Sequence, residues 1–446
     1  MEPAAPRPVP PASSASGCAL GQPYAPRRRE ASPLYRVLAD HFEALERVHE
    51  ERCEPTHGPL RAAARRAVGR LLDCGLLEHG FARVRCPDCR GEFLVAFRCQ
   101  GRQFCPSCHA RRLAEWSRWL DERLLARVVH RQVVLTVPKR LRAYFLYDRR
   151  RLSLLSRVAY CTVRDYLRAA LDEREAAPGA IVCIQSFGAL VHWHPHLHVL
   201  MSDGAFCHDG TFLPAPAHEA AVLEGAWRRA VLAAFVRAGW LEEEAAIAML
   251  GWPHSGFGAH VGPPIAGADR EGLLRVARYG ARAPVAESRL RYHVERAEIE
   301  RVSDARAGPY VGVHQMSALE FLARWVDQVP ERYETRVRYY GAYATRRRVW
   351  WRRRGVVLVP APEREPAAHE PAGDWPALRA RRRRWAELLR RVFQVEVETC
   401  PRCGGAMRIV AFVTEPTVVR RILAHLARRR IEARAGPWAG AAAAPG

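Results

Sequence analysis

The spacing of apolar residues along the chain predicts a mixture of helices and strands. Leu34, Leu38, Phe42 and Leu45 recur at helical spacing, and helical periodicity continues to about residue 80. A strand-like run of β-branched and apolar residues follows at His130–Val137. We expect further helices over residues 110–127, 149–174, 217–238, 240–250 and 270–281, and strands and a helix up to about residue 345. The pattern therefore predicts an α+β fold.

Composition divides the chain into five segments. Residues 1–33 are rich in Pro and Ala and predict a disordered tail. Residues 34–127 contain a cysteine-rich stretch at 86–109, and residues 128–345 contain most of the predicted strands. Residues 346–376 are basic at first and then, from 360, rich in Pro, Glu and Ala, which is typical of a linker. Residues 377–446 are expected to form a small C-terminal module with a Cys-x-x-Cys pair and a helix.

Net charge narrows the class of partner. The 446 residues carry a net charge of +23 with a pI near 10.2, which indicates a polyanionic partner. Aromatic residues interrupt the arginine runs, and cations beside aromatic rings suit phosphates and unpaired bases. Solvated helix faces are the alternative interpretation of these runs, which are Arg346–Arg348, Arg352–Arg354 and Arg381–Arg384, beside Trp350, Trp351 and Trp385.

The sequence also bears on the compartment. No apolar run approaches the ~18 residues needed to cross a bilayer, and the N-terminus lacks the hydrophobic core of a signal peptide. We therefore expect no membrane partner and a soluble, cytoplasmic, nucleoid-associated protein. In that compartment the 13 cysteines are expected to stay mostly reduced.

Four histidines within seven residues form the most informative motif, His192-Trp-His-Pro-His-Leu-His198. Its flanks are strand-like, so His196 and His198, two positions apart, are expected to project from one face. Two neutral imidazoles in that arrangement form half of a divalent-metal site. Pro195 cannot donate to a ladder, so we expect irregular pairing just before it, and the facing of His192 and His194 stays open. A histidine-rich strand without a metal is the alternative interpretation.

Two Cys-x-x-Cys pairs, Cys86/Cys89 and Cys105/Cys108, are separated by fifteen residues. This spacing predicts a zinc ribbon in which the four thiolates hold one structural Zn²⁺. Redox-active or free thiols are the weaker alternative, because a redox pair is not repeated at this spacing.

Further candidate ligands and DNA contacts surround this stretch. Cys99 and His109 are spare candidates, and Cys400/Cys403 form half a ribbon that could take ligands from elsewhere. Nearby arginines make the stretch a candidate DNA reader, namely Arg98, Arg102, Arg111 and Arg112.

Several segments together resemble the IS91-type transposases, members of the HUH single-strand nuclease superfamily. These segments are the cysteine stretch with Arg131–Pro138, Gln185-Ser-Phe-Gly188 with the histidine motif, Ala277–Pro284, Val337–Ala344, and the C-terminal stretch from Leu388 to Ile409. The resemblance covers roughly residues 34–430. It implies a zinc-binding DNA-recognition domain at 34–127 and an HUH nuclease domain at 128–345, an antiparallel sheet with flanking helices.

The resemblance also implies the chemistry. His196 and His198 would bind a catalytic Mg²⁺ or Mn²⁺ with Gln185 as a third ligand, and Tyr279, on a helix facing the metal, would be the nucleophile. Attack on a scissile phosphate of single-stranded DNA at an element end would leave a 5′-phosphotyrosine and a free 3′-OH, as in rolling-circle-type transposition. Three arginines near the tyrosine are expected to contact the DNA and stabilise negative charge: Arg275, Arg278 and Arg282.

The sequence departs from two-tyrosine members of the family, which place their tyrosines four residues apart. Position 275 is arginine, so the chain resembles a single-tyrosine variant. Tyr339, Tyr340 and Tyr343 are the alternative nucleophiles. No ATP is expected to be used, because the covalent link keeps the bond energy and Lys139, the only lysine, follows no glycine-rich phosphate loop.

Two other functions compete with the transposase. A His-metal-dependent hydrolase would need further ligands at later strand ends, and the later histidines follow no such pattern. A non-catalytic zinc-ribbon DNA-binding protein, or a degraded transposase, explains the charge and the cysteines but leaves the histidine motif without a role. The later histidines that argue against the hydrolase, because they follow no regular pattern of strand ends, are His254, His260, His293 and His314.

Overall fold

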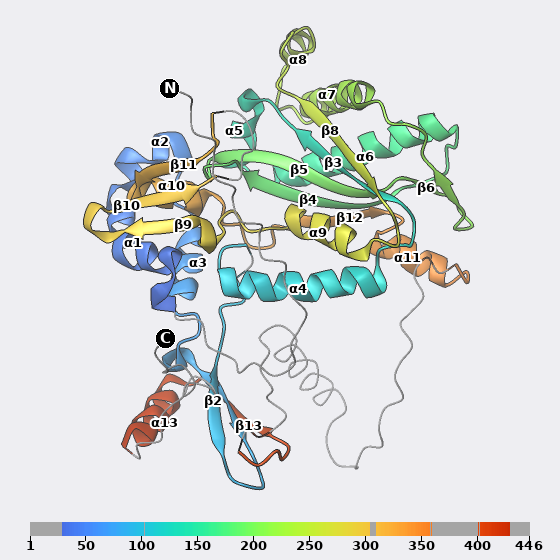
Figure 1. Cartoon of the computed structure of the whole chain (residues 1–446). Helices are drawn as coiled ribbons and strands as arrows, with labels where there is room; N and C mark the ends of the chain where they lie inside the picture. Colours follow the sequence, from blue (N-terminus) through green and yellow to red (C-terminus); the bar gives the residue numbers. More distant parts are fainter. Residues whose placement is uncertain are drawn as a thin grey trace, which may run out of the picture. The chain divides into compact units, whose positions relative to one another are not determined.

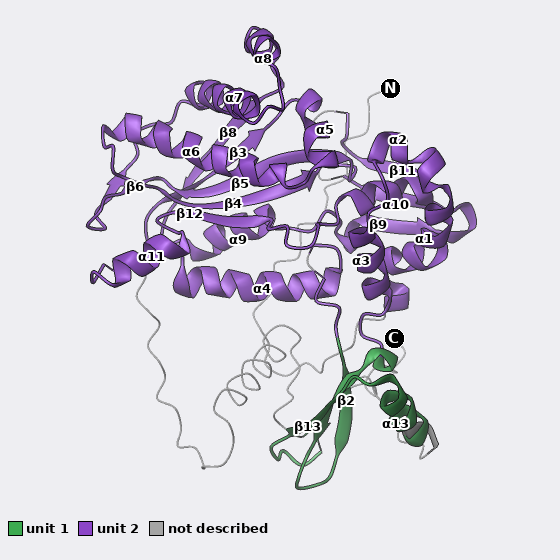
Figure 2. Ribbon diagram, turned by 180° about the vertical axis from the view of Figure 1, so that it is seen from behind, with its two compact units in different colours: residues 1–27, 77–97, 373–446 green, residues 28–76, 98–372 purple. Residues whose placement is uncertain are grey.

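The computed structural model describes residues 29–101, 103–303, 309–356, 358, 400 and 402–428. The chain divides into two compact units (Figure 2). The large unit contains residues 28–76 and 98–372, and the small unit contains residues 1–27, 77–97 and 373–446. The tail expected over residues 1–33 is described only from residue 29. The linker at 360–376, the run Arg381–Arg384, Trp385 and Arg102 lie outside the described residues.

A five-stranded antiparallel sheet forms the centre of the large unit (Figure 1), and it confirms the predicted mixture of helices and sheet. Every residue of its strand β4 is buried, because helices cover both faces. This burial explains why the segment is continuously apolar rather than alternating. In spatial order the strands are β12 (Val337–Gly341), β4 (Gly179–Phe187), β5 (Trp193–Ser202), β3 (His130–Thr136) and β8 (Gly258–Ile265).

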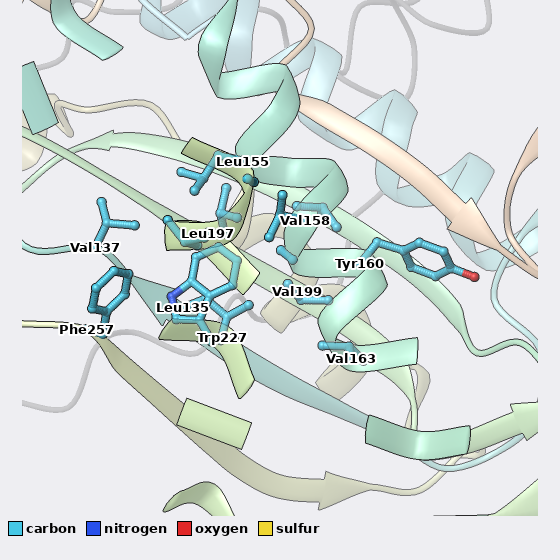
Figure 3. Packing of buried hydrophobic residues seen from close by; sticks show 14 of the residues in the cluster. Leu135, Val137, Leu155, Val158, Tyr160, Val163, Leu197, Val199, Trp227 and Phe257 are labelled. Atoms are coloured by element: carbon cyan, nitrogen blue, oxygen red, sulfur yellow. The ribbon is translucent and has the colours of Figure 1, made fainter. Parts of the chain in front are cut away.

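One face of the sheet carries the main apolar core (Figure 3). Leu135, Leu197 and Val199 pack there with residues of α6 and α7, and Trp227 of α7 is fully buried among them. Burial of such a cluster is the main source of stability for a domain of this size. The helices of this layer are α5 (Lys139–Tyr147), α6 (Arg151–Leu171), α7 (Ala220–Arg237) and α8 (Glu243–Leu250).

The opposite face of the sheet packs on α4 (Pro106–Arg123), α9 (Arg270–Gly280) and α11 (Thr345–Arg352). The strands contribute Ile181, Cys183 and Leu200 to this second cluster. Asp269 caps the N-terminus of α9: its carboxylate accepts a hydrogen bond from the Gly272 N–H at 2.9 Å. A short hairpin, β6 (Gly204–Phe206) and β7 (Phe212–Pro214), packs against α11.

The remainder of the large unit has its own core. It combines α1 (Pro33–Arg52), α2 (Glu54–His57), α3 (Ala62–Leu72) and α10 (Ala318–Asp327) with a three-stranded sheet in the order β11–β10–β9. α1 begins where the Ser32 hydroxyl accepts a hydrogen bond from the Tyr35 N–H and Pro33 occupies the first turn. The strands are β9 (Leu290–His293), β10 (Glu298–Val302) and β11 (Val313–Ser317), and the single-turn 3₁₀ helices are η1 (Arg29–Ala31), η3 (Glu287–Arg289) and η4 (Val294–Arg296).

The small unit joins two distant parts of the chain. The hairpin of β1 (Phe81–Arg85) and β2 (Glu92–Ala96) pairs with β13 (Arg408–Val413), and η2 (Leu77–His79) and α13 (Pro416–Arg428) complete the unit. This grouping differs from the sequence-based division, which keeps residues 34–127 together and 377–446 apart. Local apolar patterns could not reveal it, because the β1–β13 pairing spans more than 300 residues of sequence.

Candidate active site and cysteine clusters

Strand β5 places the histidine motif on the face of the sheet that α9 covers. Alternation along the strand sends Leu197 and Val199 into the core beneath α6 and α7, whereas His198 contacts α9. The neighbouring strand β4 sets Gln185 directly opposite His196 and Cys183 opposite His198. Two strands and one helix therefore meet at this point.

The pairing of β4 with β5 is irregular where Pro195 predicted it. The register shifts between Gln185 and Phe187, opposite the start of the motif. Through this irregular stretch the imidazole rings follow one another along the chain, with centroids 5.7 Å apart for His192 and His194 and 5.3 Å apart for His194 and His196. The four histidines therefore form a continuous row.

The Nε2 atoms of His196 and His198 lie 3.1 Å apart. His196 Nδ1 donates to the backbone carbonyl of His194 at 2.8 Å, which leaves the lone pair on Nε2. His198 Nδ1 contacts the side-chain amide of Gln132, from β3, at 3.0 Å. A single cation with nitrogen ligands at about 2.1 Å could take both Nε2 atoms at this separation.

Burial keeps both rings neutral. It lowers the pKa of His196 to about 4, and it lowers the pKa of His198 well below the ordinary value of an imidazole. His198 is only 6% exposed. Neutral imidazoles are the form that binds metal ions, so the environment suits a ligand pair.

Gln185 connects the strands to α9. Its side-chain NH₂ donates to the carbonyls of Tyr279 at 2.7 Å and Gly280 at 2.9 Å, which are among the last carbonyls of the helix. Its Oε1 is buried and accepts no hydrogen bond within the described part of the chain. A buried amide oxygen without a partner, opposite His196, fits the third-ligand position expected from the sequence.

Tyr279 lies at the end of α9, against the histidine pair. Its ring meets that of His198 edge-on, with centroids 5.4 Å apart and an interplanar angle of 85°. The side chain remains 48% exposed, so a large substrate can reach it. Gly280 makes this approach possible, because a Cβ there would lie 3.3 Å from the Cβ atoms of both Cys183 and His198.

The three arginines near Tyr279 have different surroundings. The Arg282 guanidinium stacks over the Tyr279 ring at 4.7 Å and over Phe187 at 5.1 Å. Arg278 forms an ion pair with Glu271, and Arg275 is exposed. Of these three arginines, Arg282 is the one whose guanidinium stacks on the ring of the nucleophile candidate.

The alternative tyrosines all make contacts within the fold. The Tyr343 hydroxyl is fully buried at 2.5 Å from His130 Nε2, and burial raises the pKa of Tyr343. Trp116 Nε1 donates to the Tyr339 hydroxyl at 2.6 Å, and burial raises the pKa of Tyr339 as well. Tyr340 shares a hydrogen bond of 2.9 Å with Ser156. These contacts give the three hydroxyls structural roles.

His194 precedes His196 in the row of imidazoles, but the later histidines are not grouped with the pair. Among the described residues, the groups of three or more His, Cys, Asp or Glu that could hold an ion are two cysteine clusters. Within that part of the chain the later histidines thus add no ligands to His196 and His198, and the further ligands that a hydrolase site would need are not found there.

The first cysteine cluster lies in the large unit and consists of Cys74, Cys99, Cys105 and Cys108, with their sulfurs within 4.8 Å of one another. Sγ separations of 3.6–3.8 Å match the ~3.8 Å expected for a tetrahedral zinc with Zn–S bonds of about 2.3 Å. His109 is outside the cluster; its Nδ1 accepts a hydrogen bond from the Gln103 N–H at 3.2 Å.

The second cluster lies in the small unit and consists of Cys86, Cys89, Cys400 and Cys403. The ribbon expected from spacing is therefore corrected, because Cys86/Cys89 and Cys105/Cys108 do not share one cluster. The fold changes unit after residue 97, so each pair meets a different second pair. Sequence reasoning missed Cys74, which stands alone in a segment predicted to be helical, and it missed Gln132, a single amide within the strand-like run His130–Val137.

The other arginines and tryptophans predicted to contact DNA have varied surroundings. Arg111 pairs with Glu115 at 2.8 Å, Arg112 is exposed, and Arg98 is half-buried. In α11 the guanidinium of Arg347 stacks on the rings of Trp350 and Trp351. Trp351 is 1% exposed and so belongs to the core rather than to a base-stacking surface. No helix among the described residues is long and apolar enough to span a membrane.

Comparisons with known proteins agree with this arrangement. A family model described as "Putative transposase" matches residues 179–349, which contain the histidine motif and α9, and the "Transposase zinc-binding domain" model of IS91-type transposases matches residues 44–137. The chain is 24% identical over 361 residues to "Transposase for insertion sequence element IS801" of Pseudomonas savastanoi pv. phaseolicola, covering 72% of this chain and 80% of that protein.

A second relative is "Putative transposase y4qJ" of Sinorhizobium fredii (strain NBRC 101917 / NGR234). It is 28% identical over 323 residues, covering 66% of this chain and 77% of the relative. No solved structure matches the chain. Two family models over separate parts of the chain and two relatives described as transposases lead to the same result: the chain belongs to the IS91-type transposases.

Proposed function

We propose that this transposase cleaves and rejoins single-stranded DNA by the HUH mechanism, through a 5′-phosphotyrosine formed on Tyr279, in rolling-circle-type transposition. The observation that carries the proposal is the edge-on contact of the Tyr279 ring with His198, at 5.4 Å, beside a histidine pair whose Nε2 atoms are 3.1 Å apart. The exposed hydroxyl-bearing side chain of α9 therefore lies beside the candidate metal site on β5.

His196, His198 and Gln185 would hold the divalent ion, Mg²⁺ or Mn²⁺. Bound there, such an ion would polarise the scissile phosphate and offset its charge. The residues fit this role, because two neutral imidazole nitrogens and one buried amide oxygen without a partner are available. Gln132 would orient His198: with its amide oxygen turned toward the ring, it accepts the Nδ1–H and leaves Nε2 for the ion.

Tyr279 supplies the nucleophile. Its phenolic oxygen forms a bond to phosphorus, the bond from phosphorus to the 3′-oxygen breaks, and the proton lost by the phenol is balanced by the one gained by the leaving 3′-oxygen. Arg282, stacked on the tyrosine ring, is placed to counter charge on the phosphate. Rejoining reverses the step with a 3′-hydroxyl as the attacking group, so no nucleotide triphosphate is needed.

The test is adduct formation on a labelled single-stranded oligonucleotide that carries an element end, with Mn²⁺ present. The wild-type protein should give a DNA–protein band that survives denaturing electrophoresis, and Tyr279→Phe should give none, because the bond to phosphorus cannot form. Tyr333→Phe is the matched control, since Tyr333 is another exposed tyrosine, 84% exposed and outside the site. This control should behave as the wild type does.

Two results would overturn the proposal. An adduct in Tyr279→Phe would assign the nucleophile to another side chain, with the three tyrosines of residues 337–344 as the next candidates. Absence of any adduct or cleavage in the wild type, together with intact DNA binding, would favour the non-catalytic DNA-binding protein, for which the arginine at position 275 is the specific sign.

A further inference from the structure

The C-terminal Cys-x-x-Cys pair, Cys400/Cys403, lies beside the pair Cys86/Cys89. Sγ of Cys89 is 3.4 Å from Sγ of Cys400, and Sγ of Cys86 is 3.6 Å from Sγ of Cys403. The four sulfurs all lie within 4.8 Å of one another. The family model for the zinc-binding domain ends at residue 137, so Cys400 and Cys403 fall outside the region it matches.

The two pairs have the same local structure. Each follows the pattern Cys-Pro-x-Cys-x-Gly, and in each the N–H of the first cysteine donates to the carbonyl of the glycine five residues later, at 2.8 Å for Cys86 and 2.7 Å for Cys400. Tight turns of this kind point both thiols to one side. Two such turns facing one another form the ligand set of a zinc ribbon.

The turns are also fitted closely to each other. A Cβ on Gly405 would lie 2.0 Å from a carboxylate oxygen of Asp88, so no larger residue is accommodated there without movement. Beyond the turns, β1 pairs with β13 from Phe81–Val413 to Arg85–Arg408. The cysteine cluster therefore sits at one end of a ladder that joins the same two chain segments.

The described part of the small unit has a small apolar core. Among its described residues, buried hydrophobic side chains form a cluster of five, which includes Cys86 and Cys400 themselves, and a cluster of four. A core of this size usually needs a metal or disulfides to stay folded. The sulfur separations fit metal coordination and exceed the disulfide S–S length of about 2.05 Å.

We propose that Cys86, Cys89, Cys400 and Cys403 bind a second structural Zn²⁺, separate from the ion of the Cys74, Cys99, Cys105 and Cys108 cluster. This ion closes a zinc ribbon whose halves precede and follow residues 98–372 in sequence. The C-terminal segment is therefore part of a zinc module, and the β1–β2 hairpin depends on residues 400–413 for its fold.

Zinc counting on the full-length chain tests the proposal. After brief treatment with a mild chelator, metal analysis should find two Zn²⁺ per chain, one for each cluster. Cys403→Ser and Cys105→Ser should each lose one equivalent, and the double variant should lose both. Cys207→Ser, outside both clusters, is the control and should keep two.

A second measurement needs no variant and covers the case of insoluble mutants. In the wild type, Cys86, Cys89, Cys400 and Cys403 should resist alkylation until zinc is removed, while Cys207 reacts throughout. Hydrogen exchange at β1 and β13 should speed up when zinc is removed. One Zn²⁺ per chain with Cys400 and Cys403 alkylated as fast as Cys207 would overturn the proposal, as would retention of two ions in Cys403→Ser.

Discussion

Replacing Gly280 with alanine tests whether the close approach of α9 to the sheet positions Tyr279. The added Cβ would lie 3.3 Å from the Cβ and Sγ atoms of Cys183 and from the Cβ of His198. Carbon pairs prefer about 3.5–4.0 Å, so the added Cβ and the strand atoms must move apart by a few tenths of an ångström. The obstructing Cβ atoms are fixed to central strands of the sheet, so the helix end must retreat, carrying Tyr279 with it.

The expected effect on stability is small, because two contributions oppose each other. Overpacking costs about 1–3 kcal/mol, and alanine in place of glycine in a helix gains about 0.5–1 kcal/mol. The net loss of stability should be about 0–2.5 kcal/mol. The effect on chemistry should be larger, since a misplacement of about 1 Å can slow a reaction about 100-fold, so for this smaller displacement of Tyr279 we expect the adduct to form about 3- to 10-fold more slowly.

The assay pairs urea unfolding with the single-turnover rate of adduct formation on the single-stranded end. Gly69→Ala is the matched control: Gly69 lies in α3 with no atom within 4 Å of an added Cβ, so it should be more stable by about 0.5–1 kcal/mol and react at the wild-type rate. Gly280→Ala reacting at the wild-type rate would refute the positioning argument, whatever its stability.

Two further predictions separate orienting and structural roles from catalysis. Gln132→Ala should raise the Mn²⁺ concentration needed for half-maximal adduct formation about 10- to 100-fold, because His198 loses the partner of its Nδ1; an unchanged Mn²⁺ titration would contradict this role. Tyr343→Phe should lower the free energy of unfolding by about 1–3 kcal/mol, because His130 Nε2 loses its buried partner, yet it should still form the adduct. Loss of the adduct in a folded Tyr343 variant would show that this hydroxyl has a catalytic role.

Elements whose pattern is local were predicted well from the sequence. The helix expected over 149–174 is α6, Arg151–Leu171, and the helix expected over 270–281 is α9, Arg270–Gly280. The helix expected at 110–127 instead spans Pro106–Arg123, because a proline can occupy the first turn and its N–H is not needed there. Apolar periodicity therefore located these helices, while their ends depended on capping residues.

The cysteines show where local spacing fails. A Cys-x-x-Cys turn supplies two of the four thiolates that a zinc ion binds. Its sequence carries no information about which other cysteines supply the remaining two. Fifteen residues between Cys89 and Cys105 permit one ribbon, but the chain passes from the small unit to the large unit after residue 97. The second ligands are Cys74 with Cys99 in one case and a pair 311 residues after Cys89 in the other. Only the tertiary fold could determine this pairing.

The histidine site has some features that the local sequence pattern predicted and others that only the tertiary fold determines. Strand alternation alone put His196 and His198 on one face, and Pro195 alone indicated the irregular pairing that precedes them. The position of the helix was different, since nothing in Ala277–Pro284 specifies which strand it meets. That contact follows from Gly280, which admits α9 to within van der Waals distance of His198, and from Gln185, whose amide satisfies two carbonyls at the helix end. The nitrogen of this one side chain thus holds the helix end that carries the candidate nucleophile, while its oxygen, which accepts no hydrogen bond from the described residues, is the atom that we propose binds the ion. The helix position and the proposed ligand set therefore depend on the same residue.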